Sequence, residues 1–179
     1  SEMCIRDSLG DGWTGNAAQA ELVTDPSTGA RFLHAEFDGK APGNLELVNR
    51  FETRNRTTDW SKTSDVWEEP AVLAAALRPS AMKPLDGVVA ETAARITAGA
   101  TTDVEKVRAI YAYIVANCYR NLDTPGCGPG DAVATLTSAG LGGKCADLNG
   151  LFVALTRASG VPARDMYGVR VAPSAFGYK

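Results

Sequence analysis

Hydrophobic and polar side chains alternate in the first third of the chain, and this pattern changes to a helical spacing after Trp60. Alternation with a period of two is typical of strands that bury one face, and clusters of Asp, Pro, Ser and Gly between the segments indicate turns. The pattern predicts three strands, at residues 20–24, 31–38 and 45–53. We therefore expect a small antiparallel β module, with His34 on the more polar and solvated face of its second strand.

Beyond Trp60 the apolar residues recur every three or four positions, which places them on one face of a helix. The spacing predicts a short helix that ends near Leu77 and further helices at residues 85–96, 103–117, 132–136 and 145–158. Thr102 and Glu105 have the spacing of a capping box, and Asp131 stands where it would cap the next helix. The apolar face expected for the helix at 103–117 carries Val104, Val107, Ile110, Tyr111, Ile114, Val115 and Cys118.

Cys145 stands at the start of the last of these helices, directly after Gly142, Gly143 and Lys144. Unpaired N–H groups and the dipole at a helix N-terminus favour a negatively charged thiolate, and the neighbouring Lys144 adds a cation. The two glycines let the backbone turn sharply and approach a substrate closely. This arrangement predicts a cysteine nucleophile, and a buried structural thiol is the alternative interpretation.

The same stretch resembles the transglutaminase-like superfamily of papain-fold cysteine enzymes. The shared features are Gly-Lys-Cys at 143–145, Leu-Phe-Val-Ala-Leu at 151–155, and Arg-Ala-Ser-Gly-Val-Pro-Ala-Arg at 157–164, with a hydrophobic strand expected from about Ala163. The resemblance implies an α+β fold, in which a small antiparallel β module precedes the helical half of a papain-like transglutaminase core whose C-terminal sheet is mostly missing. It also implies a Cys nucleophile, a His base and an Asp that orients the His, and of these only Cys145 is matched.

The family order is Cys, then His, then Asp, but the sole histidine, His34, precedes Cys145. We therefore expect a piece of a longer protein in which the His and Asp follow Lys179, and we expect this piece alone to lack turnover. The first eight residues resemble the translation of a transposase adapter used in sequencing-library preparation, and an ordinary polar N-terminus is the alternative. The expected organisation is an artefact at 1–8, a β-rich module at 9–61, a linker with a short helix at 62–83 and an incomplete transglutaminase-like core at 84–179.

Composition and cysteine spacing exclude several classes of function. With 45% hydrophobic and 22% charged residues the chain is typical of a globular domain. The net charge of −3 comes without a basic run, so nucleic acid is not an expected partner, and no apolar stretch approaches the roughly 20 residues that span a membrane. No Cys-x-x-Cys pair is present, so we expect no metal and no other cofactor. Cys118 is expected in the core, and Cys127, in a Gly/Pro-rich loop, is either an exposed bystander or the partner of a cysteine beyond Lys179.

Several polar residues near Cys145 have both a structural and a catalytic interpretation. For Asp147 a stabilising role in the first helical turn is favoured, because a carboxylate suits the helix dipole. Asn149, one turn after Cys145, either contacts substrate or packs, and Arg164 is expected to make a structural ion pair. For the oxyanion of an acyl transfer, the N–H of Cys145 is the first expected donor, and the loop at 126–131 is the candidate source of the second.

The resemblance therefore predicts an enzyme in which Cys145 attacks an amide carbonyl of a protein or peptide substrate and forms a thioester. Resolution by water would make it a peptidase or amidase, and resolution by a lysine amine a crosslinking transglutaminase. We favour hydrolysis. The alternative is a non-catalytic module with the same fold that binds a peptide or protein. The cellular compartment is left open, and an extracytoplasmic or periplasmic location is compatible with a lost signal peptide.

Overall fold

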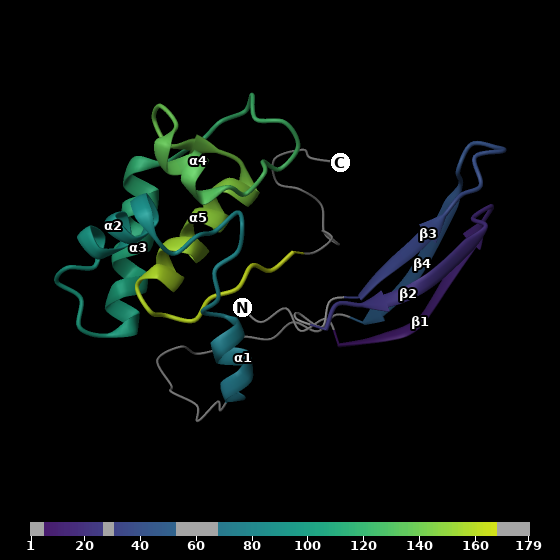
Figure 1. The fold of residues 1–179 in the computed structure, drawn as a ribbon, viewed down its shortest axis with the longest axis horizontal. Helices are drawn as coiled ribbons and strands as arrows, with labels where there is room; N and C mark the ends of the chain where they lie inside the picture. The colour runs from purple at the N-terminus through teal and green to yellow at the C-terminus, as the bar shows by residue number, and fades with distance from the viewer. Residues whose placement is uncertain (1–5, 27–30, 53–67, 168–179) are drawn as a thin grey trace. The chain divides into compact units, whose positions relative to one another are not determined.

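The computed structural model of the chain describes residues 6–26, 31–52 and 68–167 (Figure 1). The chain divides into two compact units, Ser1–Val66 and Trp67–Lys179. Small antiparallel strand pairs make up the described part of the first unit, and five helices with one short strand pair make up that of the second. The arrangement is of the α+β class.

The first unit contains two antiparallel strand pairs within its described residues. Strand β1 (Arg6–Gly15) pairs with β4 (Leu45–Glu52), and β2 (Gln19–Thr24) pairs with β3 (Arg31–Glu36). The three predicted strands are therefore present, and β1 was not predicted because Gly and Asp interrupt its alternation. This strand begins at Arg6, within residues 1–8, which we interpreted from the sequence as a translated adapter.

His34 lies in β3 on the face that its sequence pattern predicted. Its side chain is exposed and stands opposite Glu21 of β2, while the neighbouring Leu33 and Ala35 are partly buried. Because side chains alternate between the two faces of a strand, this is the expected solvated position.

The second unit is built around its last helix. Its elements are α1 (Pro70–Ala75), α2 (Gly87–Ile96), α3 (Asp103–Asn117), β5 (Tyr119–Arg120), α4 (Ala132–Thr137), β6 (Gly142–Gly143) and α5 (Cys145–Ala158). Helix α5 packs against α2, α3 and α4, as Figure 1 shows. Strands β5 and β6 form a short parallel pair, and the turn of chain from β6 leads directly into α5.

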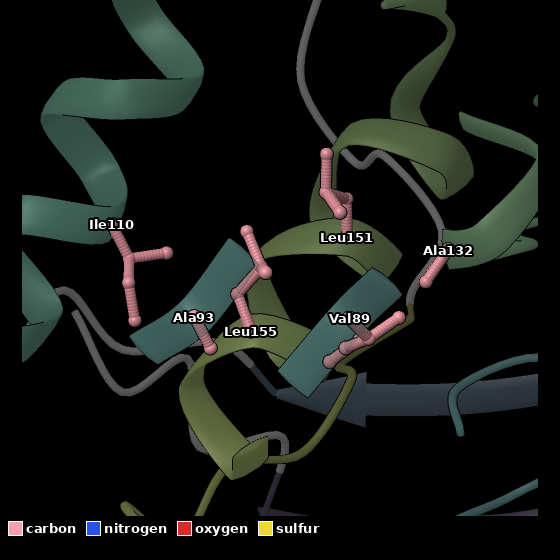
Figure 2. Close-up of a cluster of buried hydrophobic side chains, with 7 residues drawn as sticks. Val89, Ala93, Ile110, Ala132, Leu151 and Leu155 are labelled. Carbon is pink, nitrogen blue, oxygen red and sulfur yellow. The ribbon is translucent and has the colours of Figure 1, made fainter. Parts of the chain in front are cut away.

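A small hydrophobic cluster holds these helices together. Its fully buried members, drawn in Figure 2, come from all four of the packed helices: Val89, Ala93, Ile110, Ala132, Leu151, Ala154 and Leu155. Helix α5 contributes three of the seven, because its apolar residues repeat at helical spacing on more than one face. The core thus fixes α5, and with it the position of Cys145.

The predicted apolar face of α3 is partly wrong. Ile110 is fully buried, and Ile114 and Cys118 pack against the core cluster as expected. Three other members of the predicted face are exposed by 60% or more: Val104, Tyr111 and Val115. The helix is apolar around much of its circumference, and the spacing alone did not decide which stripe the other helices would cover.

The strand expected from Ala163 is also absent from the described residues. Residues 162–167 run without helix or strand after α5. Backbone contacts there are made to non-strand partners: the N–H of Ala163 donates to the carbonyl of Ala76 at 3.0 Å, and Nε of Arg157 donates to the carbonyl of Ala163 at 2.7 Å. The rest of the predicted strand lies outside the described residues.

The predicted capping box at the start of α3 is present. The hydroxyl of Thr102 accepts from the N–H of Glu105 at 3.2 Å, and the carboxylate of Glu105 accepts from the N–H groups of Thr101 and Thr102 at 2.8 and 2.9 Å. These hydrogen bonds, with the Thr101 N–H contributing most, lower the pKa of Glu105 from 4.5 to about 2. The charged form is the one that the folded helix stabilises.

Acidification is therefore expected to weaken the start of α3. Because the pKa of Glu105 is lower in the folded state, its contribution to stability is complete above 4.5 and is lost as the pH falls toward about 2. Urea unfolding followed by far-UV circular dichroism should show Glu105→Gln less stable than wild type above pH 4.5, with the difference shrinking toward pH 2. Glu91→Gln in α2 is the control, and an equal pH dependence in both variants would contradict the prediction.

Candidate functional site

Cys145 is the first residue of α5, and its side chain is exposed. Lys144 precedes it in an extended conformation as the N-cap residue, so the chain turns into the helix at this point. Within the described residues the N–H of Cys145 has no hydrogen-bond acceptor. The exposed thiol does not fit the alternative of a buried structural cysteine, and a free N–H next to it can stabilise a developing oxyanion.

Asp147 anchors the start of α5 to the loop at 126–131. Its side chain is buried, with 4% of the residue exposed, and its two oxygens accept from two backbone N–H groups, those of Gly130 and Lys144, each at 2.9 Å. This geometry agrees with the stabilising role expected for Asp147. The sequence did not predict that Asp147 would also bind the N–H of Gly130 in the loop. A carboxylate at the third position of the helix also opposes the positive end of the helix dipole.

Glycine is required around the Asp147 carboxylate. A Cβ on Gly128 would overlap the carboxylate, and a Cβ on Gly143 would lie 2.5 Å from the Cβ of Asp147. Gly128 has in addition a φ of +86°, a conformation that other residues rarely adopt. The glycines of the loop and of β6 thus let the backbone close around the carboxylate.

The loop at 126–131 also contacts the first turn of α5 directly, since the N–H of Ala146 donates to the carbonyl of Cys127 at 2.8 Å. The N–H of Gly128 donates to Pro125, and that of Gly130 to Asp147. Two of the loop N–H groups expected to offer a second oxyanion donor are therefore engaged elsewhere. These two candidates are therefore occupied by hydrogen bonds that organise the loop and its contact with α5.

A cleft opens beside Cys145, with a volume of about 580 Å³. It lies between the start of α5 and the segment that follows this helix, and it is lined by Cys127, Cys145, Ala146, Asn149, Phe152, Val153, Ala163, Arg164, Asp165, Met166 and Tyr167. Asn149 lines the cleft, and its Nδ2 donates to the carbonyl of Cys145 at 2.7 Å. The wall is mainly apolar, with few polar groups, as small-molecule and peptide sites commonly are.

The charges at the cleft differ from those expected. Within the described part of the chain, Arg164 makes no ion pair, and its exposed side chain lines the cleft. The next residue, Asp165, is the one that pairs: its Oδ2 lies 3.1 Å from Nζ of Lys83, and both side chains are largely buried. The predicted ion pair of Arg164 was thus wrong, and the neighbouring Asp165 forms an ion pair instead. Nothing in the sequence identified Lys83, because its partner is 82 residues away.

Cys118 does not take part in this site. It is the C-cap residue of α3 and packs against the hydrophobic core, and burial raises the pKa of its thiol. The predicted core position is confirmed. In the described ranges no group of three or more His, Cys, Asp or Glu residues could hold a metal ion, and no helix there is long and apolar enough to cross a membrane.

Comparison with known families identifies the region that carries the site. The family description "Transglutaminase-like superfamily" matches residues 90–178, a range that includes the cysteine helix, the loop at 126–131 and every residue that lines the cleft. Residues 90–178 are a transglutaminase-like superfamily domain. The resemblance seen in the sequence is thereby confirmed. The transglutaminase-like superfamily commonly contains cysteine enzymes, so the exposed Cys145 lies in a domain of a kind that uses such a residue.

One relative among curated proteins is an uncharacterized protein of Haemophilus influenzae. It is 30% identical over 164 residues, which are 88% of this chain and 44% of the relative. The chain therefore spans less than half the length of this relative. No solved structure matches the chain.

Proposed function

We propose that the transglutaminase-like domain belongs to a cysteine enzyme that acts on amide bonds, with Cys145 as its nucleophile. The observation that carries this proposal is the exposed thiol at the first position of α5, beside a cleft and next to an N–H that has no acceptor among the described residues. A helix N-terminus favours the thiolate, which is the reactive form of cysteine. The chain would thus present a thiol to the cleft from the start of α5.

The first chemical step would be attack of the Cys145 sulfur on an amide carbonyl. The carbonyl oxygen would take up negative charge in front of the Cys145 N–H, and collapse of this intermediate would leave a thioester and release an amine. Water would then hydrolyse the thioester. The apolar cleft wall with Arg164 and Asn149 among its polar groups suits a peptide, whose backbone is polar and whose side chains are partly apolar.

The amine leaves as a neutral group only if it receives a proton. The sole histidine, His34, precedes Cys145 in the sequence, which is the reverse of the order that the family resemblance implies for the base. We propose that proton transfer depends on a His base and an Asp that orients it, as the family resemblance implies, and the chain matches 44% of the length of its relative.

The test is an acyl-enzyme trap on the full-length protein. After incubation with a pool of peptide amides and an acid quench, we expect a mass adduct on the peptide that contains Cys145, removable by hydroxylamine as a thioester is. Cys145→Ala should lose the adduct and lower turnover by about 10⁴-fold or more. Cys118→Ala is the matched control and should keep both.

The same experiment distinguishes the proposed enzyme from the second candidate function. A non-catalytic binding module is favoured by the place of the sole histidine, His34, before Cys145 in the sequence, and it predicts peptide binding that Cys145→Ala leaves unchanged, without any adduct. Adding a primary amine distinguishes the two enzyme types: product joined to the amine indicates transfer, whereas free acid indicates hydrolysis. Turnover that survives in Cys145→Ala would refute the nucleophile.

A further inference from the structure

We propose that Cys127 and Cys145 form a peroxide-reactive dithiol, in which Cys127 closes a reversible disulfide with the oxidised Cys145. The proposal rests on the proposed function only for its consequence, which is that the disulfide removes the nucleophile from action. The chemistry itself depends on two thiols and their geometry. The described part of the chain supplies both.

The backbone already holds the two residues at disulfide distance. The carbonyl oxygen of Cys127 accepts a hydrogen bond from the N–H of Ala146, with an N···O distance of 2.8 Å. The nitrogen of Ala146 belongs to the peptide bond that joins it to Cys145, so this hydrogen bond also fixes the distance between Cys127 and Cys145. Standard bond lengths then put the two Cα atoms roughly 4–7 Å apart. Disulfides bridge Cα atoms that are about 4.4–6.8 Å apart. Both side chains are exposed and both line the same cleft.

The loop is anchored on one side of Cys127 and open on the other. Gly128 is packed against Asp147, whose carboxylate also holds Gly130, so this side stays next to α5. On the other side Gly126 has open space around it and a φ of +56°. Glycine accepts many backbone conformations, so a small rotation there can turn the Cys127 side chain toward its partner without moving α5.

The reaction with a hydroperoxide balances in two steps. In the first, the Cys145 thiolate attacks the terminal peroxide oxygen: an S–O bond forms, the O–O bond breaks, and the leaving oxygen takes up a proton and departs as an alcohol, or as water when the oxidant is hydrogen peroxide. In the second, the Cys127 sulfur attacks the sulfur of the sulfenic acid: an S–S bond forms, the S–O bond breaks, and the hydroxyl leaves as water with the thiol proton. Two thiols are oxidised and one peroxide is reduced.

The position of each thiol gives it a different part. Cys145 is the proposed nucleophile of the domain and is exposed at the start of α5, so it is the residue that meets the peroxide. Cys127 lies in the loop and acts as the resolving thiol. Capture of the sulfenic acid prevents its further, irreversible oxidation to sulfinic acid, and an external dithiol restores both residues.

The experiment uses the chain with Cys4 replaced by Ser, treated with one equivalent of hydrogen peroxide. Peptide mapping without reduction should find Cys127 linked to Cys145, and the protein should lose two titratable thiols that dithiothreitol restores. Cys127→Ser should instead accumulate a dimedone-reactive sulfenic acid on Cys145 and roughly tenfold more sulfinic acid at excess peroxide. Cys118→Ser is the matched control and should form the same disulfide as the parent.

Linkage of Cys118 to either residue would overturn the proposal, as would a Cys145 sulfenic acid that persists equally with and without Cys127. No part of this readout requires turnover. A failed disulfide therefore leaves the nucleophile assignment standing, and a failed acyl-enzyme trap leaves the disulfide standing.

Discussion

Asp147→Ala is expected to lower the free energy of unfolding of the helical unit by about 2–4 kcal/mol. The side chain is 4% exposed, and its oxygens accept the N–H groups of Gly130 and Lys144. Removing the carboxylate leaves two backbone donors without partners, that of Gly130 in a buried position and that of Lys144 in a partly buried one, and their desolvation is no longer compensated. The loop at 126–131 loses at the same time one of the two described hydrogen bonds that join it to α5.

Urea unfolding followed by far-UV circular dichroism measures this loss. Asp131→Ala is the matched control, because Asp131 also accepts one N–H, that of Ala134 at 2.9 Å, but at the exposed start of α4. A lost N-cap there costs about 1 kcal/mol. Asp147→Asn retains one acceptor oxygen and should lie between wild type and Asp147→Ala. If Asp147→Ala costs no more than Asp131→Ala, the carboxylate does not anchor the loop.

Lys83→Met is expected to destabilise the chain by about 3–5 kcal/mol. Nζ of Lys83 lies 3.1 Å from Oδ2 of Asp165, with side-chain exposures of 11% and 18%. The other oxygen of Asp165, Oδ1, is buried and has no hydrogen-bond partner among the described residues. Loss of Lys83 therefore leaves a buried carboxylate without a counter-charge, which costs more than the pair itself contributes.

A double-mutant cycle tests the reason for this effect. Lys83→Met combined with Asp165→Leu removes both charges, and we expect it to recover most of the stability that Lys83→Met loses. Lys40→Met is the matched control: its ion pair with Asp38 has the same 3.1 Å distance but exposures of 84% and 48%, so the loss should stay below about 1 kcal/mol. Equal losses at Lys83 and Lys40 would show that burial does not decide the effect.

The same substitution reports on the cleft. Asp165 follows Ala163 and Arg164, and all three line the cleft beside Cys145. The ion pair with Lys83 therefore holds one wall of the proposed site, together with the hydrogen bonds that join Ala163 to Ala76 and Arg157. The rate at which iodoacetamide alkylates Cys145 should differ between Lys83→Met and the wild type, whereas the rate for Cys118 should be the same in both.

The sequence by itself determined the local features of this protein. The helical spacing predicted α2, α3 and α5 to within a few residues, and the Thr102–Glu105 and Asp131 caps were read correctly from residue type and spacing. It also placed Cys145 at a helix N-terminus. These features depend on residues within one turn of each other, so the relevant interactions are visible in a short stretch of sequence.

Only the tertiary structure decided which of these residues act together. Helix α3 is apolar around much of its circumference, and contact with α2 and α5 alone determines that Ile110 is buried while Tyr111 is exposed. The pairing of Lys83 with Asp165, the capture of the Gly130 N–H by Asp147 and the approach of Cys127 to Cys145 all join residues separated by 17 or more positions. Such contacts depend on how the helices pack. The sequence offers several residues of similar character for each contact, and the packing determines which of them lie close together.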